Sequence, residues 1–238
     1  MMDKRYPRLK LKMLLLVVAG TLGALAAALF LWEMVVDGLL QDPFARSVLW
    51  VCQNLFGCDE AGAGPLAGPV YAAAVILPMG ADIPGLNDSK KLTAKKRNVL
   101  FDQITATAEA YSIAFVTAEE IDSLDILNAR MLAMNRAIEG LSIRPDLCLI
   151  DGNRDHGSSV SITAPHMCLV GGDGKSASIA AASILAKVSR DRYMGEMAAV
   201  YPVYGFERHK GYPTQLHYQR LRQYGPCPIH RRTFLKKL

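Results

Sequence analysis

The sequence has no C-x-x-C pair, and its five cysteines stand at irregular spacing, most of them in apolar stretches. An odd number of cysteines at such spacing is a poor basis for a disulfide framework or a structural zinc site. We therefore expect reduced thiols that behave as small core residues. Reduced cysteines are typical of a reducing compartment, so we expect a cytoplasmic protein. The residues concerned are Cys52, Cys58, Cys148, Cys168 and Cys227.

Charge is missing from the twenty residues between Met13 and Trp32. At about 1.5 Å per residue, an apolar helix of this length could span roughly 30 Å of hydrocarbon. Basic residues precede it, so the positive-inside rule would hold the N-terminus inside and export the rest. The stretch exceeds the roughly 7 to 15 apolar residues of a cleaved signal peptide. Two hypotheses stay open, namely a membrane tether through Met13 to Trp32, and a biological start at Met34 that leaves residues 1–33 outside the working protein.

Acidic residues are nearly missing from the end of the chain. After residue 206, eight basic residues stand against the single acid Glu207. Next to a cluster of carboxylates, such a cationic surface favours a polyanionic ligand whose phosphates the basic side chains hold. On charge alone, a solvated helix face remains the alternative. The basic residues are Arg208, Lys210, Arg220, Arg222, Arg231, Arg232, Lys236 and Lys237.

Length and composition suit one large α/β domain with extensions, because 238 residues of 51% hydrophobic content can bury a sizeable core. We assign residues 1–54 to a basic stretch, an apolar segment and an amphipathic connector. Residues 55–238 are the main domain, including a basic C-terminal segment at 201–238. Hydrophobic patterns predict strands and helices in alternation. We expect strands at 70–77, 111–116, 147–150 and 160–170, and a buried helix at 176–188.

Two helices in the middle of the chain have sequence signals at their ends. Thr93 can cap one helix. Thr117 and Glu120 have the spacing of a capping box, which predicts the start of a second helical region. That region is interrupted near Asp125 and ends at Gly140, a residue typical of helix C-termini.

Four acidic residues stand where apolar runs give way to turns, namely Asp59, Glu60, Asp151 and Asp173. If they converge, they form a divalent-metal site, since oxygen ligands select hard cations. Neighbouring side chains of a strand point to opposite faces, so Asp59 and Glu60 can share one site only if the strand ends between or just after them. Two alternatives stay open: Asp151 as a plain turn residue and Asp173 as a helix-start acid.

Several motifs follow one another in order between residues 57 and 234. They are C-D-E-A-G at 58–62, G-P-L-A-G-P-V at 64–70, D-S-K-K-L at 88–92, D-G-N at 151–153, A-A-S-I-L-A-K-V at 181–188, G-F at 205–206, H-K-G-Y-P-T at 209–214 and G-P at 225–226. Long motifs in a fixed order are far more specific than one short pattern. Together they resemble the ribonuclease HII family. The resemblance implies a ribonuclease H-like fold of the α/β class, with a central mixed sheet flanked by helices and a helical, basic C-terminal segment.

The resemblance also implies an activity. It is that of an endonuclease that cuts the RNA strand of RNA–DNA hybrids and nicks DNA at embedded ribonucleotides, as in ribonucleotide excision during DNA repair. The products carry 5′-phosphate and 3′-hydroxyl ends, and Mg²⁺ or Mn²⁺ is required. The family's metal-binding catalytic acids correspond to Asp59, Glu60, Asp151 and Asp173. We expect a monomer that binds RNA–DNA hybrid and ribonucleotide-containing duplex DNA.

The chain departs from the family at one place, where the family's Gly-Arg-Gly segment reads Gly62-Ala63-Gly64. In the family this segment approaches the ribose 2′-hydroxyl and its neighbouring phosphate, largely through backbone groups, beside a tyrosine that matches Tyr212. We therefore expect ribonucleotide selectivity to be retained. Substrate grip or turnover should be weaker, because a charge-assisted contact is worth about 1–3 kcal/mol. Lys90 is a further candidate for phosphate binding.

Two other kinds of protein fit parts of the sequence. The apolar segment and the missing arginine are compatible with a membrane-tethered or catalytically weakened nucleic-acid-binding protein of the same fold. A different nuclease of this fold, such as a junction resolvase, would show no dependence on a 2′-hydroxyl. The four intact acids argue against the weakened binding protein, and an all-DNA control distinguishes the resolvase.

Overall fold

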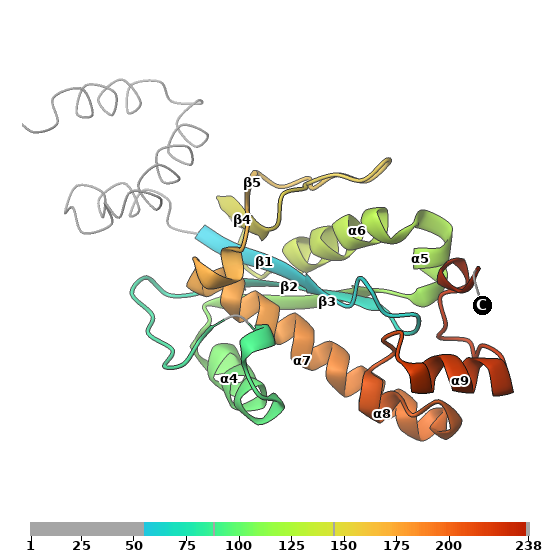
Figure 1. The fold of residues 1–238 in the computed structure, drawn as a ribbon. Helices are drawn as coiled ribbons and strands as arrows, with labels where there is room; N and C mark the ends of the chain where they lie inside the picture. Colours follow the sequence, from blue (N-terminus) through green and yellow to red (C-terminus); the bar gives the residue numbers. More distant parts are fainter. Residues whose placement is uncertain (1–54, 88, 145, 237–238) are drawn as a thin grey trace, which may run out of the picture. The chain divides into compact units, whose positions relative to one another are not determined.

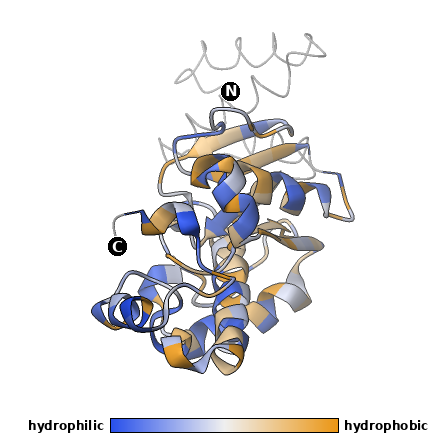
Figure 2. Cartoon of the chain, turned by 90° about the vertical axis from the view of Figure 1, so that its right-hand side faces the viewer, coloured by the Kyte–Doolittle hydropathy of each residue, from blue (hydrophilic) through white to orange (hydrophobic). Residues whose placement is uncertain are grey.

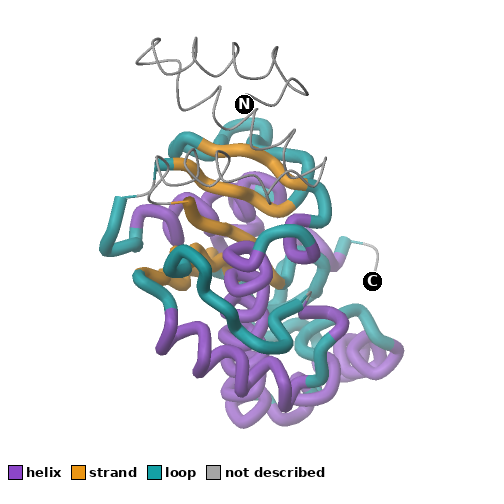
Figure 3. Tube along the Cα trace, turned by 90° about the vertical axis from the view of Figure 1, so that its left-hand side faces the viewer, coloured by secondary structure: helices purple, strands orange, loops and turns teal. Residues whose placement is uncertain are grey.

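One mixed sheet organises the part of the chain that the computed structural model describes, residues 55–87, 89–144 and 146–236. Its strands lie in the order β3-β2-β1-β4-β5, and Figures 1 and 3 show them side by side. The pairs β1–β2 and β2–β3 are antiparallel, and β4–β5 is parallel. The strands are β1 (Leu55–Ala61), β2 (Val70–Ile76), β3 (Ala110–Val116), β4 (Leu147–Asp151) and β5 (His166–Leu169).

Helix α6 (Ile126–Glu139) covers one face of the sheet and helix α7 (Ala177–Val200) covers the other (Figure 1). Strand β2 is apolar at almost every position because both of its faces are covered. Successive side chains of a strand point to opposite faces. Accordingly, Ala72 and Ala74 belong to the core that includes α6, whereas Ala73 belongs to the core that includes α7.

The predicted capping box is confirmed at helix α5 (Ala118–Leu124). The Thr117 hydroxyl accepts from the Glu120 N–H at 3.2 Å, and a Glu120 carboxylate oxygen accepts from the Thr117 N–H at 2.8 Å. The predicted interruption is also confirmed, since Asp125 has φ 77° and its carboxylate caps α6. Helix α6 ends just before Gly140, as the sequence predicts.

The helices on the other face begin as predicted. Thr93 caps helix α4 (Ala94–Thr107), where its hydroxyl accepts from the Lys96 N–H. Helix α7 begins after Ser176 but continues twelve residues beyond the predicted end at 188. The hydrophobic pattern located only the part that packs against the sheet. The rest of the helix lies against the C-terminal segment, where Met194 is fully buried.

The predicted strand at 160–170 is shorter than expected, because β5 includes only His166–Leu169. The preceding residues form a loop whose backbone is held by side chains of α6. The Asn128 side-chain oxygen accepts from the N–H groups of residues 159 and 160, and that of Asn135 accepts from residue 163. Pro165 has no N–H to donate to a ladder, so regular pairing begins only after it.

The C-terminal segment is helical, as expected. Figure 2 shows hydrophilic and hydrophobic positions interleaved along it. It packs around its own small core, which includes Tyr204, Phe206 and Leu66. Its elements are the short helix α8 (Phe206–His209), helix α9 (Gln215–Tyr224) and the 3-10 turns η4 (Pro202–Tyr204) and η5 (Arg232–Leu235).

The described helices are all too short or too polar to cross a bilayer. The apolar stretch from Met13 to Trp32 and the connector lie outside the described residues, as does Cys52. The described cysteines are free thiols. Three of them are buried and Cys168 is half-buried, which agrees with the expected reduced core residues.

Candidate active site

Asp59 and Glu60 stand near the end of β1 and point to opposite faces of the sheet. Asp59 pairs with Ala73 of β2, whose side chain enters the α7 core, and Glu60 pairs with Ala72, whose side chain enters the α6 core. Directly paired residues of antiparallel strands share a face. The strand ends one residue later, and Gly62, with φ 96°, turns the chain away. The pair therefore lies at the strand end, as the sequence requires for a shared site.

Asp59 is almost fully buried, with 6% of its surface exposed. Burial raises its pKa well above the usual range, and the charges of Glu60 and Asp151 raise it further. A hydrogen bond from Ser183 of α7 favours the ionised form. The Ser183 hydroxyl also lies 2.8 Å from the hydroxyl of Ser89, which begins the 3-10 turn η2 (Ser89–Lys91). Exposed Lys90 is thus on a turn anchored beside Asp59.

Glu60 faces Arg130 of helix α6, with 2.6 Å between Oε1 and Nη2. Burial raises the pKa of Glu60, Arg130 lowers it, and the charge of Asp151 raises it. Among the described residues, the Nε of Arg130 is a buried polar atom without a hydrogen-bond partner. Sequence reasoning missed this arginine. The available signal was a basic residue between buried positions of an otherwise apolar helix face.

Asp151 ends β4, the strand next to β1 in the sheet. Ile150 enters the α6 core, so Asp151 faces the α7 side together with Asp59. Its Oδ1 accepts from the Gly172 N–H at 2.7 Å. Because its charge raises the pKa of both Asp59 and Glu60, the three carboxyl groups form one electrostatic cluster.

Asp173 follows directly after the residue that binds Asp151. It lies in the 3-10 turn η3 (Gly172–Gly174), just before α7. It also lines a hollow of about 340 Å³ together with residues of the 81–87 loop. The hydrogen bond between Gly172 and Asp151 therefore brings the turn that carries Asp173 to the end of β4.

Within the described residues, no three His, Cys, Asp or Glu side chains already meet in a geometry that could hold a metal ion. Three of the four carboxylates are each engaged by a separate hydrogen-bond donor: Asp59 by the N–H of Glu60, Glu60 by Arg130, and Asp151 by the N–H of Gly172. Like charges repel, so separate donors are the expected arrangement. The carboxylate oxygens fit Mg²⁺ or Mn²⁺, because these hard cations prefer oxygen ligands. The burial of the carboxylates also disfavours negative charge that no cation compensates.

The Gly62–Gly64 turn and Tyr212 are brought together by the fold. A Cβ placed on Gly64 would lie 4.0 Å from Cε1 of Tyr212. Tyr212 is 40% exposed, and Gly64 is exposed as well. The two candidate substrate-binding elements therefore share one accessible surface.

The prediction of an exposed basic surface at the end of the chain is wrong for one residue, Arg231. Arg231 has no exposed surface at all, and Arg190 of α7 is equally buried. Both guanidinium groups lie behind the loop that follows Gly62. The sequence placed Arg231 on the exposed basic surface, because a basic residue in a basic segment predicts exposure, and it did not single out Arg190.

The histidines of the C-terminal segment are structural. His209, His217 and His230 are all buried. The Nε2 atoms of His217 and His230 lie 3.0 Å apart, and the rings of His209 and His217 stack at 4.4 Å. Burial lowers the pKa of His217 and that of His230 to about 4 each. At neutral pH they are uncharged and join the core rather than a phosphate.

A family model described as Ribonuclease HII matches residues 56–237. The chain belongs to the ribonuclease HII family. Ribonuclease HII of Endomicrobium trichonymphae is 58% identical over 179 residues, which cover 75% of this chain and 83% of that relative. Ribonuclease HII of Burkholderia mallei strain SAVP1 is 57% identical over 178 residues, covering 75% of this chain and 81% of that relative.

Solved structures agree with this assignment. The crystal structure of ribonuclease H2 from Pyrococcus horikoshii OT3 has a TM-score of 0.63 at 28% identity, covering 76% of this chain and 93% of that one. Bst ribonuclease HIII in complex with Mn²⁺ has a TM-score of 0.56 at 19% identity, covering 73% of this chain and 63% of that one, and shows the fold alone. The predicted ribonuclease H-like fold is confirmed.

Membership also decides between the functional alternatives raised by the sequence. Ribonuclease HII enzymes are metal-dependent endoribonucleases that cleave RNA in RNA–DNA hybrids and at embedded ribonucleotides. This supports the enzyme over a binding protein of the same fold.

Proposed function

We propose that residues 55–238 form a catalytic domain that hydrolyses ribonucleotide phosphodiesters with Asp59, Glu60, Asp151 and Asp173 as its catalytic acids. The observation that carries this assignment is the electrostatic cluster at the strand ends, where the charge of Asp151 raises the pKa of Asp59 and of Glu60. Buried carboxylates held close together favour a divalent cation as their compensating charge.

The same four acids are the ligands we propose for Mg²⁺ or Mn²⁺. When bound, such an ion neutralises the phosphodiester and lowers the pKa of the attacking water. The protein's own part is to hold carboxylate oxygens in place. The Ser183 hydroxyl and the Gly172 N–H orient Asp59 and Asp151 respectively. Arg130 holds Glu60 on the other face of the sheet, so Glu60 must leave or share this partner when an ion binds.

Recognition of the substrate falls to the Gly62-Ala63-Gly64 turn, Tyr212 and Lys90 in this proposal. The turn and Tyr212 lie side by side on an accessible surface. A protein distinguishes RNA from DNA at one position by contacting the 2′-hydroxyl. Backbone groups of the turn and the Tyr212 hydroxyl are suited to that contact, and Lys90 is suited to a phosphate near Asp59.

The test is nicking of a DNA duplex that contains one ribonucleotide, with and without Mg²⁺ or Mn²⁺. We expect metal-dependent cleavage that leaves 5′-phosphate and 3′-hydroxyl ends, and no cleavage of the matched all-DNA duplex. Asp59→Asn should lower the cleavage rate about 10³-fold while binding of the duplex persists. Equal cleavage of both duplexes would instead indicate a nuclease such as a junction resolvase.

The proposal also covers the metal ion, the binding partners and the cellular location of the protein. Both Mg²⁺ and Mn²⁺ fit the acids, and one related structure of this fold is a complex with Mn²⁺. The ribonuclease HII of Archaeoglobus fulgidus has been solved as a complex with PCNA, at 23% identity and a TM-score of 0.62. We propose that this chain works as a monomer in the cytoplasm, where its nucleic-acid substrate is found. Membrane contact through Met13 to Trp32 stays a prediction, and fractionation with detection of N-terminal peptides tests it.

A further inference from the structure

Two buried arginines lie behind the loop that joins β1 to β2. Arg190 is 1% exposed and Arg231 is 0% exposed. Within the described residues, neither has a carboxylate at ion-pair distance, although a buried charge normally requires a charged partner. Their guanidinium groups are instead surrounded by backbone carbonyls, which a charge in a low-dielectric interior binds strongly. Two buried positive charges therefore hold the loop at residues 62–69 in place.

Arg231 uses all three of its nitrogen atoms on this loop. Nη2 donates to the Gly62 carbonyl at 2.6 Å, Nη1 to the Ala63 carbonyl at 2.8 Å and Nε to the Gly68 carbonyl at 2.9 Å. The planar fork of arginine can reach several acceptors at once, whereas the single ammonium of lysine cannot. The carbonyls of Gly62 and Ala63 are thereby fixed toward the interior.

The orientation of these carbonyls determines where the neighbouring N–H groups point. No peptide bond in the described residues is cis, and in a trans peptide the C=O and the following N–H point in opposite directions. The N–H groups of Ala63 and Gly64 therefore point away from Arg231. Neither N–H has an acceptor among the described residues. They face the accessible side of the turn, next to Tyr212.

We propose that Arg231 is a positioning residue for ribonucleotide recognition, which holds the Ala63 and Gly64 N–H groups as paired donors for the 2′-oxygen of the ribonucleotide. This inference rests on the proposed function and deepens it. Adjacent backbone N–H groups form an anion-binding concavity of a known kind. The buried positive charge directly behind them strengthens this concavity, at the place where the family's arginine is replaced by Ala63.

The structure supplies a matched control. Arg190 is buried to the same degree and also donates to three carbonyls, but these belong to Ala67, Pro69 and Lys210. It does not hold the Gly62 or Ala63 carbonyl, and it meets the recognition surface only through its packing against Gly62 and its position 5.7 Å from the centre of the Tyr212 ring. Arg231→Lys and Arg190→Lys should therefore lower the melting temperature to a similar extent. Only Arg231→Lys should release the two N–H donors.

The test compares binding and cleavage in these two variants. For Arg231→Lys we expect kcat/KM on a single-ribonucleotide duplex to fall about 10- to 100-fold, since a misplaced contact of about 1 Å has this effect. The preference for that duplex over an all-DNA duplex, measured as the ratio of their Kd values, should fall toward one. The Kd for all-DNA duplex should stay within about twofold, and Arg190→Lys should keep most of the preference.

An unchanged preference in Arg231→Lys, or an equal loss in both variants, would overturn the proposal. If Arg231→Lys does not fold, NMR of the unsubstituted protein tests the proposal instead. The amide proton resonances of Ala63 and Gly64 should then shift on addition of the ribonucleotide duplex but not of the all-DNA duplex, and identical shifts overturn the proposal. Failure of the proposed function would appear separately, as absent ribonucleotide-dependent cleavage in the unsubstituted protein.

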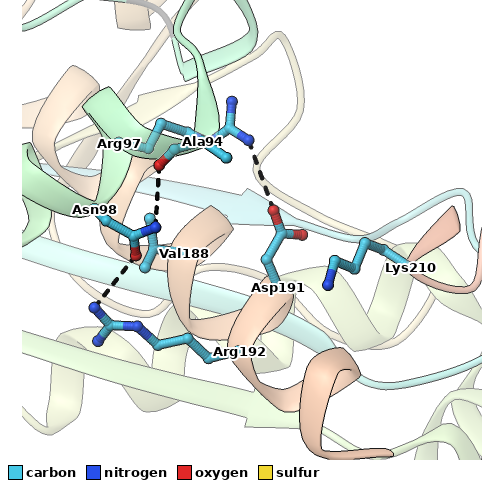
Figure 4. Close-up of a pocket in the computed structure, with 7 residues that line it drawn as sticks. All are labelled: Ala94, Arg97, Asn98, Val188, Asp191, Arg192 and Lys210. Carbon is cyan, nitrogen blue, oxygen red and sulfur yellow. Dashed lines mark hydrogen bonds and ion pairs between the residues drawn. The ribbon is translucent and has the colours of Figure 1, made fainter. Parts of the chain in front are cut away.

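A separate observation concerns a basic hollow of about 200 Å³ between α4, α7 and Lys210 (Figure 4). Its one acid, Asp191, lies 3.7 Å from Arg97 and 2.7 Å from Lys187, so two cations offset its charge. Arg192 lies over the Phe101 ring at 4.2 Å. This stacking fixes a second guanidinium at the edge of the hollow.

Lys210 completes the hollow from an unusual backbone conformation. Its φ is 51°, and its backbone N–H and C=O are held by Phe206 and Arg190. A non-glycine residue in the left-handed region is held there only by its surroundings. Figure 4 shows its side chain directed toward the hollow. Because Tyr212 follows two residues later, the hollow flanks the proposed substrate surface.

We infer that this hollow binds one backbone phosphate of the duplex, away from the bond that is cleaved. Lys210→Gln should weaken duplex binding about 3- to 10-fold and reduce the slope of log K against log salt by about 0.9. The exposed Lys95→Gln on α4 is the control and should change neither. Replacing phosphates one at a time by neutral methylphosphonates should reproduce the loss at one position, with no further loss in Lys210→Gln. Additive losses at every position, or inorganic phosphate bound here without competing with duplex, would overturn the assignment.

Discussion

The carboxylate cluster and the arginine-held loop are two buried charged regions that balance their charge in opposite ways. Asp59 is buried beside two other acids, so its pKa is raised and its negative charge lacks full compensation within the protein. Arg231 is buried without an acid, but three carbonyls accept its N–H groups. The first region therefore requires an external cation, whereas the second is complete by itself. This contrast separates a site for chemistry from a site for positioning.

The substitution with the greatest predicted consequence is in the carboxylate cluster. Asp59→Asn should lower kcat about 10³-fold, as the loss of one charge-stabilising catalytic group does. In metal-free buffer the same variant should be more stable than the unsubstituted protein by about 1 kcal/mol, because an uncompensated buried charge is removed. Thermal unfolding with and without Mg²⁺ measures this.

Mg²⁺ should raise the melting temperature of the unsubstituted protein, because a ligand that binds only the folded state stabilises it. It should have little effect on Asp59→Asn. Asp102→Asn, an exposed acid on α4, is the matched control and should respond like the unsubstituted protein. An equal Mg²⁺ response in Asp59→Asn would show that these acids are not the ion's ligands.

The same contrast explains what could be predicted from the sequence. The position of Asp151 at the end of β4 and the capping box at Thr117 follow from apolar runs and from spacings of a few residues. Such local signals are present in the sequence whatever the rest of the chain does. The positions of Asp59, Glu60 and Asp151 at strand ends could therefore be predicted, whereas their convergence was a condition that local signals do not decide.

The supporting residues could not be predicted in this way. Arg130 meets Glu60 across 70 positions of the chain, and Arg231 meets Gly62 across 169 positions. No periodicity relates residues so far apart, and a basic residue by itself predicts exposure. Strand alternation predicts that Asp59 and Glu60 point to opposite faces. The sequence could not show that α7 covers the face of Asp59 and α6 the face of Glu60, since this depends on long-range packing.

A fall in pH should affect the buried histidine pair of the C-terminal segment and the carboxylate cluster in opposite directions. Burial lowers the pKa of His217 and His230 from 6.5 to about 4. The unfolded chain then binds these protons more readily than the folded protein, so stability is full above about pH 6.5 and is lost as the pH falls toward 4. At pH 5 the loss should be about 2 to 4 kcal/mol for the pair. Protonation of Asp59, whose pKa is raised, acts the other way.

Urea unfolding at pH 7.5 and pH 5 measures this loss, and His217→Gln separates it from the carboxylate effect. The loss should be clearly smaller in His217→Gln, because one of the two buried imidazoles is gone. His156, whose side chain is 72% exposed, supplies the control, and His156→Gln should keep the full loss. If the fall from pH 7.5 to pH 5 lowered the free energy of unfolding of His217→Gln as much as that of the unsubstituted protein, the imidazole pair would not be the acid-sensitive element.

The substitution with the least predicted consequence is in the turn that Arg231 holds. Ala63→Arg restores the residue type that the family has at this place, and a charge-assisted contact is worth about 1–3 kcal/mol. We expect kcat/KM on a single-ribonucleotide duplex to rise about 10-fold, near the lower end of that range, because Arg231 already places a positive charge behind the turn. Ala63→Lys adds charge without the planar fork and should give a smaller gain. If Ala63→Arg left both KM and kcat unchanged, the missing side chain would have no role here, and Arg231 with the backbone donors would account for recognition alone.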